Sequence, residues 1–197
     1  MDLHYNNQSL AALKLLNEIE QVYNSSSRPV ILNCYIAGGI AVNFYTGQRA
    51  TADLDLEFDK RIVLPKLSVE FEKQKIYIDT NYTSSLGLIY ADYKNDAIEI
   101  TQYQPTDSTI KIKPYLFSPE DLVISKLSRW AENDQKDVQS LIDLKLLDKD
   151  LLNEKIEDAL IDYIGYDKFL KCNIKEMNEM FTNGKILRTS PSYKNGC

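Results

Sequence analysis

The chain has 197 residues, a net charge of −6, and charged and hydrophobic fractions of 26% and 44%. These values are typical of one globular domain that is long enough to bury a sizeable core. The negative charge argues against tight, non-specific binding of nucleic acid, which needs a basic surface. It weakens the hypothesis of an RNA substrate but does not exclude one, because a local basic groove could still bind RNA.

The N-terminal residues and the cysteines predict where the protein is found. The first residues lack both the basic and the apolar segment of a signal peptide, and no apolar run approaches membrane-spanning length. The three cysteines are odd in number and lack metal-ligand spacing, which fits a reducing compartment. We therefore expect a cytoplasmic protein with no membrane partner.

The first predicted elements alternate between helix and strand. Apolar residues at helical spacing predict an amphipathic helix over residues 9–23. An apolar strand over 30–37 then enters a turn at Gly38 and Gly39, and a short amphipathic helix over 40–45 follows. In the next strand, residues 52–58, the period of two separates carboxylates from apolar side chains: Asp53, Asp55 and Glu57 lie on one face, and Leu54, Leu56 and Phe58 on the other.

The middle of the chain gives weaker signals. We expect a short helix over 65–73, because proline suits its first position. Residues 86–92 and 97–103 are predicted to form a hairpin around a polar turn, and 109–115 is a further weak strand.

The C-terminal part is predicted to be helical. Ser118, Pro119 and two following acids match the preferred start of a helix, which would continue through Trp130 and break at Asn133 and Asp134. Further helices are expected over 136–147, 149–164 and 167–181. Strands early and helices late predict an α+β fold with a helical C-terminal portion.

The strongest chemical signal comes from Asp53 and Asp55. Two carboxylates two residues apart on a strand lie roughly 6–7 Å apart at their Cα atoms and on the same face. This spacing suits a pair of divalent ions about 3.5–4 Å apart, as used for in-line attack at phosphate. Gly38 and Gly39, at a strand-to-helix junction, let backbone amides approach an anion at a helix N-terminus. A phosphate cradle and a metal clamp would therefore lie on adjacent elements.

Other interpretations of Asp-x-Asp are a solvated strand face or the metal motif of a glycosyltransferase. The upstream glycine pair and the neighbouring Arg49 and Thr51 favour metal ligation. Arg49 and Thr51 are placed to reach phosphate oxygens from their loop, although a loop arginine is often simply solvated.

These residues also carry a resemblance. The pattern Gly38-Gly39, about a dozen residues, then Arg49-x-Thr51-x-Asp53-Leu-Asp55 is similar to the DNA polymerase β-like nucleotidyltransferase superfamily, and resembles most the AbiEii-type, minimal nucleotidyltransferases of bacterial toxin–antitoxin systems. The resemblance covers roughly residues 28–145. That family usually has a serine after the two glycines, where this chain has Ile40, so one hydroxyl contact to the triphosphate is missing.

The resemblance implies an architecture and further site residues. It implies a mixed β-sheet flanked by helices, which we place over 1–117; from the sequence pattern we expect a helical portion packed on this core over 118–182 and a mobile tail over 183–197. The family's third carboxylate lies on a later strand, where Glu99 matches it and Asp96 is the substitute. Glu99 would ligate one metal and help to deprotonate the acceptor hydroxyl.

Two residues of the C-terminal portion also match the family. Lys126 resembles a helical lysine directed at the nucleotide phosphates, and Asp137 resembles the aspartate of a Lys-Asp motif near the site. Lys126 could equally extend to water. Asp137 could instead pair with Lys126 or Arg129 and hold two helices together.

The resulting hypothesis is a metal-dependent nucleotidyltransferase that moves an NMP from an NTP to an acceptor hydroxyl. Asp53, Asp55 and Glu99 would hold two Mg²⁺ ions, and the acceptor, by resemblance, would be RNA, a protein side chain or a small molecule. The resemblance also implies a toxin role with an antitoxin partner. The alternative is a catalytically degenerate nucleotide-binding or protein-interaction module, favoured by Ile40 and the acidic surface. The 13 tyrosines are scattered and show no stacking platform.

Overall fold

The computed structural model describes residues 2–24, 28–63, 67–79, 88–161, 163–165 and 167–183. The chain divides into two compact units. The sheet unit consists of Met1–Ser85 and Asp92–Ser118, and the helical unit of Leu86–Ala91 and Pro119–Cys197.

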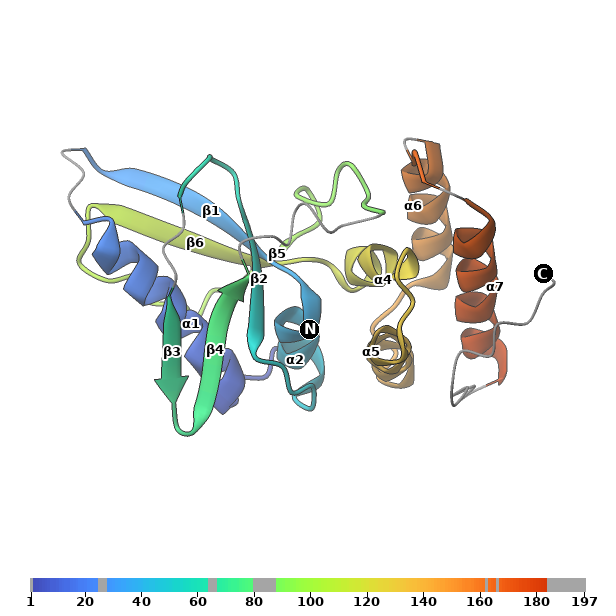
Figure 1. The fold of residues 1–197 in the computed structure, drawn as a ribbon, viewed down its shortest axis with the longest axis horizontal. Helices are drawn as coiled ribbons and strands as arrows, with labels where there is room; N and C mark the ends of the chain where they lie inside the picture. The colour runs from blue at the N-terminus through green and yellow to red at the C-terminus, as the bar shows by residue number, and fades with distance from the viewer. Residues whose placement is uncertain are drawn as a thin grey trace. The chain divides into compact units, whose positions relative to one another are not determined.

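The sheet unit contains one mixed β-sheet, coloured from blue to green-yellow in Figure 1. Its strands are β1 (Val30–Ile36), β2 (Asp53–Phe58), β3 (Ser68–Phe71), β4 (Gln74–Asp79), β5 (Ile98–Glu99) and β6 (Ile110–Leu116). Their order across the sheet is β3-β4-β2-β1-β6-β5 among the described residues. β1 is parallel to β6 and β2 to β4, whereas the β1–β2, β3–β4 and β5–β6 pairs are antiparallel.

Helices α1 (Asn7–Val22) and α2 (Gly38–Thr46) belong to the same unit and contact the sheet. The Asn6 side chain begins α1 by accepting hydrogen bonds from two backbone amides, those of Gln8 and Ser9. Apolar side chains of the central strands are buried in this core: Leu32, Cys34, Ile36, Leu54, Leu56 and Ile112. Burial of a large aliphatic side chain contributes about 1.5–3 kcal/mol, so this face anchors the unit.

The helix predicted over 65–73 is wrong. Residues 68–79 instead form a hairpin of β3 and β4, and Pro65 lies outside the described residues. Val69 and Ile76 are buried register partners, so the hydrophobic period here is two. The turn between the strands is Glu72-Lys73, both with positive φ, a conformation that usually selects asparagine or glycine. The absence of those residue types hid the hairpin.

The hairpin predicted over 86–103 is also wrong. Residues 91–96 form turns and a bend, residues 86 and 87 lie outside the described part, and only Ile98–Glu99 is a strand, which pairs with β6. The apolar residues that suggested strands, Leu88, Tyr93 and Ile100, are buried from irregular segments. By contrast, the strand predicted over 109–115 is confirmed as β6, and it pairs with all of β1.

The helical unit contains α4 (Pro119–Leu127), α5 (Glu132–Asp143), α6 (Lys149–Ile161) and α7 (Asp167–Asn183). The predicted start at Pro119 is confirmed, but the break predicted at Asn133 and Asp134 is wrong, because α5 runs through both residues. The chain turns earlier, where Trp130 has a φ of 48°. Asp134 begins α5 rather than ending a helix, since its carboxylate accepts the backbone amide of Ala131 at 2.9 Å.

These elements confirm the predicted α+β class, a mixed sheet flanked by helices with helices in the C-terminal part. None of the helices that the structure describes is long and apolar enough to cross a membrane. The mobile tail is predicted over 183–197; Asn183 ends α7, and residues 184–197 lie outside the described part of the chain.

Candidate active site

The glycine pair forms the turn between β1 and α2. Gly38 is the first residue of α2 and has a φ of 59°, which favours glycine. A Cβ atom at Gly38 would overlap the carboxylate of Asp55, lying only 2.7 Å from its Cγ. The Asp55 side chain therefore lies directly against the turn, and no larger residue fits at position 38.

Gly39 makes a second close approach. A Cβ atom there would lie 2.9 Å from Cγ2 and 3.1 Å from Cβ of Thr51. Two different side chains thus pack against the two glycines: Asp55 of β2 against Gly38, and Thr51 of the preceding loop against Gly39. The structure brings together Gly38, Gly39, Thr51 and Asp55, as the sequence predicted.

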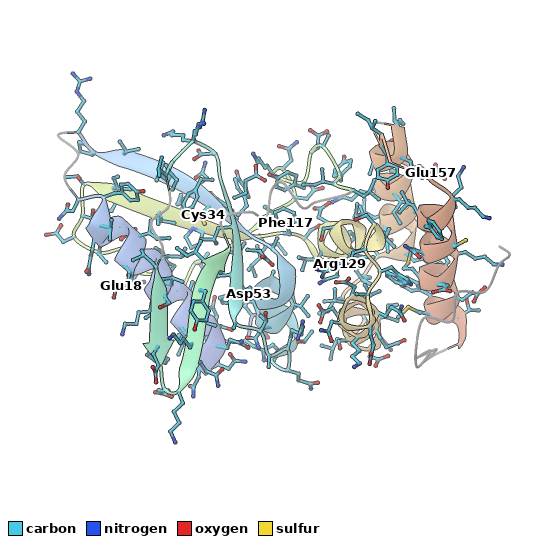
Figure 2. The ribbon with its side chains drawn as sticks, viewed as in Figure 1. Glu18, Cys34, Asp53, Phe117, Arg129 and Glu157 are labelled. Carbon is cyan, nitrogen blue, oxygen red and sulfur yellow. The ribbon has the colours of Figure 1, made fainter. Side chains whose placement is uncertain are left out.

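The acidic strand lies beside this turn because β2 is antiparallel to β1. Leu56 is the register partner of Ile36, and the backbone amide of Ala37 donates to the Asp55 carbonyl at 3.1 Å. Asp53 is exposed and Asp55 is half-buried, while Leu54, between them, is fully buried. The predicted alternation of β2 is confirmed, and Figure 2 labels Asp53 on this strand.

The loop between α2 and β2 is held by side chains from the start of α1 and from α2. Three amide side chains donate to three of its carbonyl groups: Asn6 to Gly47, Gln8 to Thr51 and Asn43 to Arg49. Asn43 is itself fixed, since its Oδ1 accepts the hydroxyl of buried Ser9 at 2.7 Å. These bonds set the backbone from which Arg49 and Thr51 would contact a ligand.

Glu99 lies elsewhere on the sheet. It is the register partner of Tyr115 on β6, and β6 and β1 separate it from β2. Three strand spacings amount to roughly 14 Å. The Glu99 carboxylate lies 3.3 Å from the ammonium group of Lys113. The structure therefore does not bring Glu99 to Asp53 and Asp55, and its substitute Asp96 lies in the turns before β5.

One acidic residue that sequence reasoning missed lies closer. β4 runs parallel to β2, and Asp79 is the register partner of Asp55. Neighbouring strands are about 4.8 Å apart, so the two backbones are adjacent. The signal was present in the sequence, where Ile76, Ile78 and Asp79 continue an alternating strand, but the helix predicted over 65–73 obscured it.

Lys126 and Asp137 meet in the helical unit, where they join α4 and α5. The Lys126 ammonium donates to Asp137 at 2.8 Å and lies 3.5 Å from Asp134, and all three residues are buried. Arg129 donates two hydrogen bonds to Asp134, at 2.8 and 2.6 Å. Burial alone would raise the pKa of Asp134, but the bonds from Arg129 and the charge of Lys126 hold it below its usual value. The alternative in which Asp137 pairs with Lys126 is confirmed.

The acidic pair fits a magnesium ion by its donor chemistry. Among the described residues, no three His, Cys, Asp or Glu side chains gather into a complete metal site. Magnesium is commonly held by one or two carboxylates, with substrate phosphates and water completing its coordination. Asp53 and Asp55 supply such a pair beside a turn suited to phosphate.

The match to a family model assigns this mixed sheet, with its glycine turn and acidic strand, to the nucleotidyltransferase class that the sequence predicted. Residues 11–181 match the family described as "Nucleotidyltransferase of unknown function (DUF6036)", and the chain belongs to this family. Membership indicates nucleotidyl transfer in general and a nucleotide substrate. No curated protein and no solved structure matches the chain.

Proposed function

We propose that the protein is a magnesium-dependent enzyme that transfers an NMP from an NTP to an acceptor hydroxyl and releases pyrophosphate. The observation that carries the proposal is the approach of the Asp55 carboxylate to Gly38. It joins a metal-binding acid and a phosphate-binding turn in one place, which is the requirement for activating a nucleoside triphosphate.

The phosphate side of the site is formed by the start of α2. The first amides of a helix have no partner within the helix, and the helix dipole adds a partial positive charge there. Gly38 and Gly39 are only half-buried, so a triphosphate can approach these amides. Thr51, packed against Gly39, and Arg49 would add contacts to the phosphate oxygens.

Asp53 and Asp55 would hold Mg²⁺, two ions in the two-metal arrangement. Metal bound there would neutralise charge on the phosphates and align attack at the α-phosphorus. For the third carboxylate, the register places the backbone of Asp79 beside that of Asp55, whereas Glu99 lies on β5. The third carboxylate would accept the proton of the acceptor hydroxyl as the new P–O bond forms and pyrophosphate leaves.

The test is transfer of label from each α-labelled NTP, with Mg²⁺, to total RNA or to lysate components. The wild type should transfer label, and Asp53→Asn and Asp55→Asn should not. Asp59→Asn is a matched control, since Asp59 follows the same strand but bonds Asn33 through both of its oxygens. If Asp59→Asn loses label transfer as fully as Asp53→Asn and Asp55→Asn do, the result would count against the proposal. Comparing label transfer in Asp79→Asn and Glu99→Gln decides which of the two residues is the third carboxylate.

A second candidate function is a nucleotide-binding module without turnover. Ile40 is fully buried in α2, so the position after the two glycines supplies packing where the resembling family has a hydroxyl. Absence of label transfer, with nucleotide binding unchanged in Asp53→Asn and Asp55→Asn, would favour this module. The acceptor class (RNA, protein or small molecule), the AbiEii-type relationship and an antitoxin partner stay predictions from the resemblance.

A further inference from the structure

An exposed aromatic ring lies beside the acidic pair. Tyr77 on β4 is the register partner of Asp53 on β2, and its backbone amide donates to the carbonyl of Ala52 at 2.8 Å. Residues paired across neighbouring strands present their side chains on the same face, about 5 Å apart. Tyr77 is 43% exposed, and Asp53 is exposed as well.

Tyr77 differs from the other tyrosines near the sheet. Tyr35, Tyr93 and Tyr103 are each at most 7% exposed, and Tyr35 and Tyr93 pack edge to face against one another. Among the described Phe and Tyr residues of the sheet unit, Tyr77 is the one that is exposed. A ligand held at Asp53 can therefore reach the exposed part of this ring.

A basic residue accompanies this ring. The Lys75 ammonium lies 5.3 Å from the centre of the Tyr77 ring, within the range of a cation–π contact. Both residues are exposed and lie two positions apart on β4, so they share one face of the strand. An aromatic ring with an adjacent cation is the combination that proteins use to stack a base and to attract its phosphates.

We propose that Tyr77, with Lys75 beside it, is a stacking subsite for a nucleobase. This inference rests on the proposed function, because it supposes a nucleotide whose phosphates lie at Asp53 and Asp55. The base belongs either to the incoming NTP or to a nucleotide of an RNA acceptor. In both cases the contact is a flat ring on the Tyr77 ring, so it tolerates different bases and depends on aromaticity at position 77.

The experiment measures binding in Mg²⁺ of three probes by calorimetry: each NTP, inorganic triphosphate, and a mixed-sequence single-stranded RNA oligonucleotide. Inorganic triphosphate occupies the phosphate cradle but has no base to stack. Tyr77→Leu keeps apolar bulk on an exposed strand but removes the aromatic face, whereas Tyr77→Phe and Tyr77→Trp keep it. Phe169→Ala, which removes a 66% exposed aromatic side chain of the helical unit, is the control.

Tyr77→Leu should weaken NTP binding roughly 5- to 100-fold and leave triphosphate binding unchanged, while the aromatic variants and Phe169→Ala bind as the wild type does. If Tyr77→Leu weakens binding of the oligonucleotide but not of NTP, the result supports the subsite and assigns the base to the acceptor. Unchanged affinity of Tyr77→Leu for both NTP and oligonucleotide overturns the subsite. If the wild type binds neither NTP nor triphosphate, the proposed function itself fails, which is a distinct result.

Discussion

Two pairs of aspartates in this chain show how differently the same side chain can be used. Asp134 and Asp137 of α5 are buried and bonded to the cations Arg129 and Lys126. Asp53 and Asp55 of β2 are exposed and half-buried, beside a glycine turn. A buried carboxylate bonded to a cation of a neighbouring helix holds the two helices together, whereas carboxylates on an accessible strand beside a glycine turn are the ones that we propose as metal ligands. Sequence spacing alone does not separate the two cases.

The largest effect is expected from the exposed pair. If Asp55 holds Mg²⁺ as proposed, Asp55→Asn should lower nucleotidyl transfer at least about 10³-fold, because metal ions stabilise the transition state by several kcal/mol. The free energy of unfolding should change little, since Asp55 is not in the core. Steady-state transfer and chemical denaturation measure the two quantities. Retained nucleotidyl transfer in Asp55→Asn would contradict the assignment of β2 to the active site.

The buried pair should respond in the opposite way. Lys126→Met leaves Asp137 without its buried cation, and breaking such a pair costs about 3–5 kcal/mol of unfolding free energy. The double variant Lys126→Met, Asp137→Leu should recover much of this stability, because neither charge is then left buried alone. Urea denaturation measures both. A stable Lys126→Met that fails to bind inorganic triphosphate would instead favour the phosphate contact predicted by the resemblance.

Acid should also weaken the buried pair. The pKa of Asp134 is lowered in the folded protein, so its contribution to stability is present above its unfolded pKa of about 3.9 and is lost as pH falls through the lower, folded value. Asp134→Asn should therefore flatten the decline of stability below about pH 4. Thermal unfolding across this range provides the comparison, and equal slopes for wild type and Asp134→Asn would show that Asp134 titrates normally.

The smallest effect is expected from the loop that precedes the exposed pair. Ser9→Ala removes the hydroxyl that bonds Asn43, whose amide holds the Arg49 carbonyl. The loss should be about 1 kcal/mol of stability, with a modest weakening of triphosphate binding. Ser140→Ala is a matched control, because its hydroxyl bonds only within α5. Similar binding in both variants would mean that the N-terminal segment does not position the loop.

Local signals allowed much of the sheet unit to be predicted from sequence. The strand, glycine turn, helix and acidic strand between Val30 and Phe58 were predicted nearly to the residue, because the glycines and the alternation of β2 are readable within a few positions. Their juxtaposition also followed, since antiparallel neighbours along the chain bring the end of one strand to the start of the next.

The remainder depends on information that is not local. The β3–β4 hairpin turns at Glu72 and Lys73 without glycine or asparagine, so its register, and with it the positions of Tyr77 and Asp79 beside β2, was not predicted. Glu99 was predicted as the third carboxylate because the sequence does not reveal the strand order, in which β1 and β6 lie between β2 and β5. Asp134 was interpreted as a helix breaker although its carboxylate caps the start of α5, because the same residue type serves both purposes.

The most direct test of the account is whether Asp55 and the glycine turn form one magnesium–phosphate site. Binding of inorganic triphosphate can be measured with and without Mg²⁺ for the wild type, Asp55→Asn and the control Asp59→Asn. We predict that Mg²⁺ strengthens binding to the wild type and to Asp59→Asn but not to Asp55→Asn. Magnesium-strengthened binding that persists in Asp55→Asn would contradict the account.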